Sequence, residues 1–242
     1  MEEQLEMDKS LEEEVLTQET ILNRGVQNLS DAFGQFENLL DDSLQGLASE
    51  DLSSLNKTVK KFDKLYKRTR NIRQKASKAL DQLGEEDLQA GHFYIILSDY
   101  LHEMTKNVRQ IVVPSQNHVG NNHKPLLAVQ IEELSTVNTN LKERFKAIID
   151  AMNDYEPEKM EKLTGQNLAA FFKAIRAFRK NQIKRIQNKE VGTRNSTLFL
   201  NHLVEYRNLA LFSNRIAKIY EDMIMDPDGE GEGGMPQGTI TE

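Results

Sequence analysis

The chain has 242 residues, which is long enough for one large domain or two small ones. It contains no cysteine and only 5 prolines, and 29% of its residues are charged, so a disulfide scaffold, a zinc ribbon and thiol chemistry are excluded and an all-helical protein is favoured. The net charge of −7 is unevenly distributed, because residues 1–20 carry −7, residues 226–242 carry −5 and the body between them carries +5. A basic body favours anionic partners or surfaces, although solubility alone also explains such a balance.

No apolar run approaches the roughly 18–20 residues needed to cross a bilayer. The acidic N-terminus also lacks the pattern of a signal peptide. We therefore expect a soluble, cytoplasmic chain. If it belongs to a membrane protein, we expect these residues to be only its extramembrane portion.

Apolar residues at steps of three and four predict two long helices in the first third of the chain. The first begins at a capping box formed by Ser10 and Glu13 and ends near Gly46 and Ser49. Residues 1–20 form an acidic N-terminal extension of the apolar part of this helix. The second begins at Leu52. The predicted inner faces are Leu22, Val26, Leu29, Phe33, Phe36, Leu40 and Leu44 in the first helix, and Leu55, Val59, Phe62, Tyr66, Ile72, Ala76, Ala79 and Leu83 in the second.

The outer faces of the second helix are rich in Lys and Arg. They form either a solvated surface or a nucleic-acid-binding surface. Aromatic residues that would stack on bases do not interleave with them, so we expect no nucleic-acid partner. The residues are Lys57, Lys60, Lys61, Lys64, Lys67, Arg68, Arg70, Arg73, Lys75 and Lys78.

A third helix should precede Pro114, which lacks a backbone N–H and should kink or end it. The segment HVGNNHKP at 118–125 is rich in residues that form turns, and Pro125 suits the first position of a fourth helix. The predicted inner face of the third helix is Phe93, Leu97, Leu101, Met104, Val108 and Ile111.

The fourth helix should end near Asn153, the fifth should run from Pro157 to Gly192, and the sixth should span roughly 196–225. Residues 226–242 are acidic and Gly-rich, which predicts a disordered tail. The inner faces are Leu134, Val137, Leu141, Phe145, Ile148 and Met152 in the fourth helix, Leu168, Phe171, Ile175, Phe178 and Ile186 in the fifth, and Leu198, His202, Glu205, Leu209, Phe212, Ile216, Ile219 and Met223 in the sixth.

The two halves of the chain repeat one pattern, in which a basic second helix leads into a third helix carrying an acid and a histidine. This repeat predicts six long antiparallel helices in two three-helix units, 21–120 and 121–225. In the second unit, His202 and Glu205 lie on the apolar face. A carboxylate there must be paired, protonated or bound to something.

Metal binding is one hypothesis for these polar residues. Asp99 and Glu103 lie one helical turn apart, and with His202 and Glu205 they are candidate ligands for a divalent or ferric ion. The alternative is ordinary polar pairing between helices.

A second cluster of polar residues marks the corner between the halves. It provides either a structural turn or a site for an ion, an anion or a partner. The residues are Asn117, His118, Asn121, Asn122, His123, Lys124, Arg194 and Asn195. Catalytic motifs built on a Gly-rich phosphate loop, Gly-x-Ser-x-Gly or Ser-x-x-Lys are missing from the sequence, so we expect no enzymatic activity.

Three motifs carry a family resemblance: Asp-Tyr-Leu-x-Glu at 99–103, His-Val-x-Asn-Asn-His-Lys at 118–124, and the corner from Gly192 to Ser196 that leads to Glu205 and Asn208. With the residues around them, over roughly 21–225, they resemble the PhoU-like cytosolic domain of bacterial inorganic phosphate transporters of the PiT type, especially those of Bacteroidota.

The resemblance implies a PhoU-like architecture of two three-helix bundles and a non-enzymatic role in controlling phosphate uptake. The implied partner is a membrane phosphate transporter, either separate or the rest of the same polypeptide, at the inner face of the plasma membrane. Whether the protein also forms a homo-oligomer is left open. In the acidic signature of the family, Asp99 and Glu103 occupy the two acidic places of the first unit, and Asn201 and Glu205 those of the second.

Overall fold

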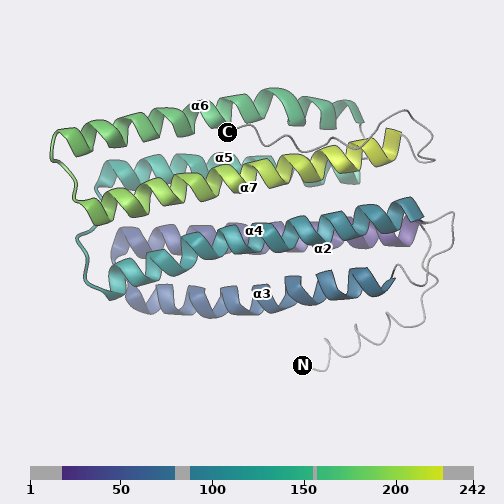
Figure 1. The fold of residues 1–242 in the computed structure, drawn as a ribbon, viewed down its shortest axis with the longest axis horizontal. Helices are drawn as coiled ribbons and strands as arrows, with labels where there is room; N and C mark the ends of the chain where they lie inside the picture. Colours follow the sequence, from purple (N-terminus) through teal and green to yellow (C-terminus); the bar gives the residue numbers. More distant parts are fainter. Residues whose placement is uncertain (1–17, 80–87, 155–156, 226–242) are drawn as a thin grey trace.

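The computed structural model describes residues 18–79, 88–154 and 157–225, and these residues form six long helices with no strand among them (Figure 1). This confirms the prediction of an all-α fold. The predicted helix start at Ser10, the inner-face residue Leu83 and the tail 226–242 lie outside the described residues. The helices are α2 (Gln18–Ser49), α3 (Leu52–Ala79), α4 (Leu88–Gly120), α5 (Ala128–Asn153), α6 (Pro157–Gln187) and α7 (Thr193–Met225).

The helices are arranged as two groups of three. Helices α2, α3 and α4 pack on one another, as do α5, α6 and α7, and the groups meet where α4 packs on α7 and α2 packs on α5. Helices α3 and α6 therefore lie at opposite edges of the molecule (Figure 1). One apolar core runs through both groups, so the unit boundary at 120/121 stays a prediction.

The core is built from the apolar faces that the periodicity predicts. All six predicted inner residues of α4 are buried. Across the junction of the two groups, the rings of Phe33 and Phe145 stack with their centroids 4.0 Å apart. Asn138 on α5 donates a 2.6 Å hydrogen bond to Asp41 on α2, so the junction contains a polar contact as well as an aromatic one.

Helix α4 does not end at Pro114 but continues to Gly120. Proline removes the hydrogen bond to the carbonyl of residue 110. Because Gln110 is exposed, water can hydrate that carbonyl. The polar turn is therefore shorter than predicted, and the segment 118–120 is still helical.

Helix α5 begins at Ala128, three residues after Pro125, which was the predicted start. The side chain of Gln130 accepts a 2.9 Å hydrogen bond from the backbone N–H of Leu127. This bond satisfies one of the free N–H groups at the helix start, so the local cap rather than the proline sets the boundary.

The predicted inner face of α6 is wrong at one residue. Phe171 and Ile175 are buried as expected, but Ile186 is 43% exposed. Gln182 and Arg185 occupy the buried positions instead.

The turn between α2 and α3 brings two helices unusually close. A Cβ atom added at Gly46 would lie 2.6 Å from Cγ of the fully buried Leu55. Glycine is therefore required by the contact with α3.

In the described residues, no helix has a stretch that is both long and apolar enough to cross a membrane.

Candidate functional site

The acidic pair on α4 is partly exposed and already engaged by bases. The Asp99 and Glu103 side chains are each 44% exposed. Arg73 Nε on α3 lies 2.5 Å from Asp99 Oδ1, and Lys106 Nζ lies 2.6 Å from Glu103 Oε1. The Arg73–Asp99 pair joins two helices, as the alternative to metal binding predicts, whereas the Lys106–Glu103 pair lies within α4.

The two candidates on α7 are more buried. His202 is 2% exposed, and its Nε2 lies 2.9 Å from Ser115 Oγ on α4. Burial lowers the pKa of His202 to about 4. The imidazole is therefore neutral near pH 7, and it joins α4 to α7 through a hydrogen bond.

Neighbouring side chains stabilise the carboxylate of Glu205 only weakly. Burial raises the pKa of its carboxyl group, and a hydrogen bond donated by Asn208 at 3.4 Å opposes the shift. Burial also lowers the pKa of His102, a neighbour of Asp99 and Glu103 on α4 whose ring lies 5.4 Å from that of Tyr66. Both shifts favour the uncharged form of the side chain.

The four candidate ligands share two helices but do not converge on a common point. Within residues 18–79, 88–154 and 157–225, no three His, Asp or Glu side chains are grouped so that they could hold an ion. Asp99 and Glu103 lie on α4, and His202 and Glu205 on α7. As arranged, this donor set does not fit a metal ion that needs three or more protein ligands.

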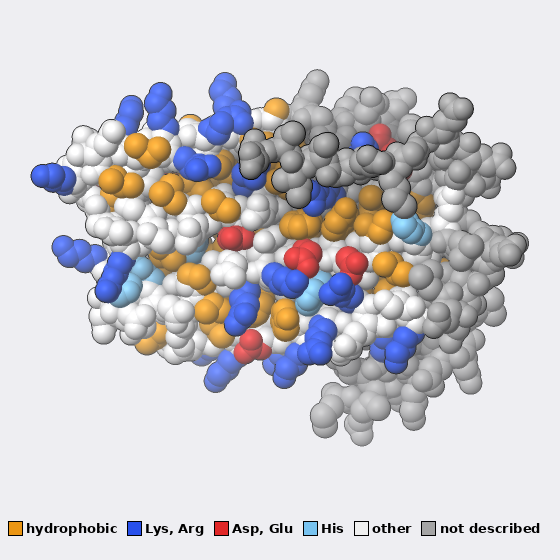
Figure 2. Space-filling model, viewed as in Figure 1, with side chains coloured by type: hydrophobic (Ala, Val, Ile, Leu, Met, Phe, Trp, Pro, Cys, Tyr) orange, Lys and Arg blue, Asp and Glu red, His pale blue; other side chains and the backbone are white. Residues whose placement is uncertain are grey.

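The face formed by α4 and α7 mixes charges. Figure 2 shows acidic side chains in its middle, with Lys and Arg beside them and along the edges of the molecule. The bases that pair with Asp99 and Glu103 come from α3 and α4. The two acids of α4 are therefore paired with bases, while Lys and Arg line the edges of the molecule.

The corner residues form a compact set of hydrogen bonds at one end of the bundle. His118 is 6% exposed, and its Nε2 lies 2.9 Å from the carbonyl oxygen of Lys124. The ring of His123 lies 5.2 Å from that of His118, and Arg194 Nη1 lies 2.9 Å from His123 Nδ1. Asn195 Nδ2 donates a 2.6 Å hydrogen bond to the carbonyl of Pro125.

Backbone hydrogen bonds stabilise the turn at this corner. The N–H groups of Asn121 and Asn122 donate 3.0 Å bonds to the carbonyls of Asn117 and Val119. Asn122 has φ of 52°, the left-handed region that asparagine tolerates better than most residues. Together, these contacts attach the link between α4 and α5 to the start of α7 and support a structural role for the corner.

A buried polar network in the second group was not predicted from the sequence. Arg185 Nη2 lies 2.6 Å from Glu133 Oε1, and both side chains are less than 10% exposed. Arg185 also donates a 2.9 Å bond to Gln182, which accepts another from Gln130 and donates one to Ser196. The network joins α5, α6 and α7.

The network explains why polar residues replace Ile186 on the inner face of α6. From Phe178, steps of four and three lead to Gln182 and Arg185, so spacing alone predicts their burial. The polarity of these two side chains argues against burial unless they have hydrogen-bond or ion-pair partners. The partner Glu133 lies 52 residues away in sequence, and nothing local indicates it.

A second buried base joins α5 to α7. Arg144 is 6% exposed, and its guanidinium donates bonds of 2.9 Å to Ser213 Oγ and 2.7 Å to Asn214 Oδ1. Burial lowers its pKa to about 10. No sequence motif singled it out.

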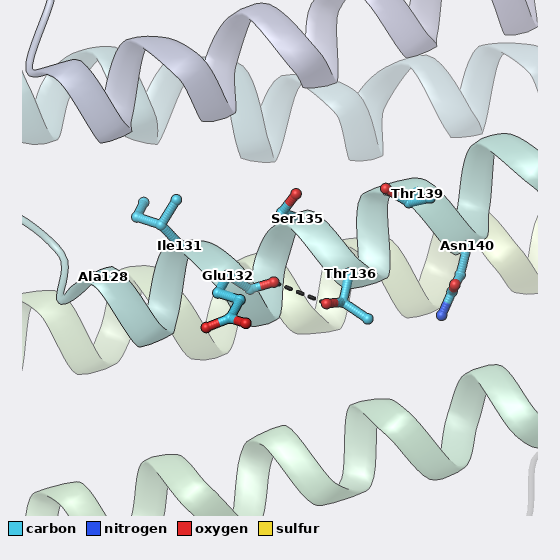
Figure 3. Close-up of a pocket in the computed structure, with 7 residues that line it drawn as sticks. All are labelled: Ala128, Ile131, Glu132, Ser135, Thr136, Thr139 and Asn140. Atoms are coloured by element: carbon cyan, nitrogen blue, oxygen red, sulfur yellow. Dashed lines mark hydrogen bonds between the residues drawn. The ribbon is translucent and has the colours of Figure 1, made fainter.

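The outer surface of α5 carries a shallow hollow of about 500 Å³ (Figure 3). Its lining residues all belong to α5, and the side chains point away from the helix axis on its outer side. The lining contains hydroxyl, amide and carboxylate groups but no base, so it lacks the charge needed to hold an anion. The residues are Ala128, Ile131, Glu132, Ser135, Thr136, Thr139 and Asn140.

Comparison with known proteins gives matches at the level of structure. No protein-family model matches the sequence, and no curated protein matches it. Crystal structures of two PhoU proteins are among those that share the fold. One is the phosphate transport system regulatory protein PhoU from Streptococcus pneumoniae, with a TM-score of 0.71 and 14% identity over 88% of this chain and 98% of that chain.

The other is PhoU from Pseudomonas aeruginosa, with a TM-score of 0.71 and 11% identity over 87% of this chain and 100% of that chain. At these identities the likeness concerns the fold. This chain therefore has the PhoU-like fold that its sequence predicts.

Proposed function

We propose that the chain is a non-enzymatic regulatory domain that controls inorganic phosphate transport by docking on a membrane permease. The observation that supports this most is the shared fold, which covers 98% of a PhoU described as a phosphate transport system regulatory protein. Because a fold can host several functions, this support is an analogy and needs a functional test.

The proposal extends to the type of transporter. The motifs at 99–103, 118–124 and 192–196 resemble the cytosolic domain of PiT-type transporters of Bacteroidota. We infer that the partner is such a permease, either separate or encoded with this chain, and that the domain lies at the cytoplasmic face of the membrane. The basic edge helix α3 offers a charged surface for this contact.

Deletion of residues 21–225 in the source cell tests the proposal. We expect phosphate uptake to lose its normal dependence on external phosphate and to regain it when the chain is supplied again. The isolated chain should also be retained by the detergent-solubilised permease and not by an unrelated membrane protein. Unchanged uptake together with no retention would contradict the proposal.

Metal binding at Asp99, Glu103, His202 and Glu205 stays a second prediction. It is supported by the weakly partnered carboxyl group of Glu205, although an ion at Asp99 would have to displace Arg73. Elemental analysis of tag-free protein, followed by titration with divalent and ferric ions, tests it. Glu103→Ala and Glu205→Gln should weaken binding, whereas Glu132→Ala on the outer side of α5 should not. Absence of co-purified metal and unchanged binding by Glu103→Ala would discard the hypothesis.

A further inference from the structure

The outer face of α6 is basic and has no acidic partner in the described part of the chain. Between Glu161 and Glu190 the sequence contains no acid. Of the bases in this interval, Arg185 is buried and paired with Glu133. The other bases on the helix whose side chains the structure describes are exposed and form no ion pair with a described residue. We call them the α6 basic face: Lys173, Arg176, Arg179, Lys180 and Lys184.

Two exposed isoleucines lie within this basic face. Ile183 is 52% exposed and Ile186 is 43% exposed. At about 100° per residue, Ile183 lies between Arg179 and Lys180 around the helix axis. Large apolar side chains are thus placed among unpaired cations on one side of α6.

Other exposed apolar residues lie at the same end of the bundle. Leu127 is 36% exposed and Val129 is 43% exposed at the start of α5. The 2.9 Å hydrogen bond between Gln130 and Gln182 joins this start to the end of α6. Figure 2 shows Lys and Arg projecting along the α6 edge, with hydrophobic side chains below them toward the same end.

We propose that the α6 basic face, with Ile183 and Ile186, docks on the surface of an anionic phospholipid bilayer. Charge complementarity supports this occupant, because the negative potential of anionic headgroups attracts each nearby Lys or Arg. Exposed isoleucines among the bases can enter the boundary between headgroups and acyl chains, as the apolar residues of interfacial helices do.

Nucleic acid is the competing occupant, and the composition of the face argues against it. Proteins bind single-stranded nucleic acid with Lys and Arg side chains combined with exposed aromatic side chains. No Phe or Tyr is among the exposed large hydrophobic residues of the described chain. Moving an aliphatic side chain from water into lipid lowers the free energy, whereas an aliphatic side chain has no ring on which a nucleobase can stack.

Helix α3 provides an internal comparison. Its outer face is also basic, and Lys64 and Lys67 are exposed without an ion-pair partner in the described residues. Among the described residues of α3, only Leu52, the first residue of the helix, is an exposed large hydrophobic side chain. A membrane surface should therefore distinguish α6 from α3, although their charges are similar.

Co-sedimentation of the full chain with lipid vesicles tests the inference. We expect binding to vesicles that contain phosphatidylglycerol, little binding to vesicles of phosphatidylcholine alone, and weakening as salt is raised. Lys180→Glu with Lys184→Glu should weaken binding roughly tenfold or more, since each nearby base contributes to attraction. Ile183→Ser with Ile186→Ser should weaken it by a similar factor, through loss of apolar insertion.

A matched control distinguishes the effect of the α6 basic face on binding from the effect of net charge. Lys64→Glu with Lys67→Glu changes the net charge of the protein equally and should leave most of the binding intact. Circular dichroism should show unchanged helix content in every variant. The inference is overturned if anionic and neutral vesicles bind alike, if the α3 variant weakens binding as much as the α6 variant, or if the isoleucine variant binds normally.

Binding of a nucleic-acid probe through α6 with no vesicle binding would also overturn it. The inference goes beyond the regulation of phosphate transport. The vesicles contain no permease, so failure of lipid binding leaves the permease test unaffected.

Discussion

At the scale of single residues, His202 should make stability depend on pH. Its pKa is about 4 in the folded chain, against roughly 6.5 when unfolded. The unfolded chain then binds the proton more strongly, so stability falls as pH drops from about 6.5 to about 4, by on the order of 3 kcal/mol. Urea unfolding across this range should show a flatter pH dependence for His202→Gln than for the wild type. His92→Gln, at an exposed position, is the control for replacing a histidine by glutamine.

The buried pair of Glu133 and Arg185 gives a second prediction at this scale. Glu133→Ala leaves a buried guanidinium without its counter-charge and should cost about 3–5 kcal/mol of unfolding free energy. Changing both residues to Met should recover much of the loss, because the unpaired charge is then removed. Asp42→Ala, which breaks an exposed pair with Lys61, should cost no more than about 1 kcal/mol in the same denaturation measurement. Equal costs for the two single variants would contradict this interpretation.

At the scale of elements, the α2–α3 hairpin depends on a close approach at Gly46. Gly46→Ala should destabilise the protein by about 1–3 kcal/mol, because Leu55 is fully buried and cannot move away from the new methyl group. Gly34 lies on the same helix with nothing within 4 Å of an added Cβ. Gly34→Ala should therefore stabilise by up to about 1 kcal/mol, through helix propensity alone. Thermal unfolding of both variants measures the contrast, and opposite signs are the expected outcome.

For the whole molecule, the shared core predicts that both groups of helices unfold together. Phe33 and Phe145 stack across the junction, and both are buried. Phe145→Ala should cost about 3–5 kcal/mol and should lower the hydrogen-exchange protection of α3 as well as α6. We expect calorimetry of the wild type to show a single transition. Two separate transitions, with protection lost only in α5–α7, would show that the groups are independent.

Periodicity alone located nearly all of each helix, because a buried stripe at steps of three and four is a local property of the sequence. It predicted the break at Gly46 and Ser49, the end near Asn153 and the start at Pro157. The boundaries predicted at Pro114 and Pro125 were less accurate. The chain tolerates Pro114 inside α4 and delays α5 beyond Pro125, because hydration and the Gln130 cap decide those positions.

The candidate site was less determined by the sequence than the fold was. Spacing placed Asp99 and Glu103 together on α4, and it placed His202 and Glu205 together on α7. Their partners Arg73 and Ser115 come from other helices, so only tertiary packing shows which groups are already satisfied.

The sequence by itself determined the helical class, the six helices and most of the buried stripes, because these follow from short-range spacing and composition. Tertiary structure decided that α4 packs on α7, that Arg185 is buried and that Ile186 is exposed. The physical reason is that the cost of burying a polar group depends on its partner. For Arg185, that partner is Glu133, which reaches it only when α5 and α6 pack together.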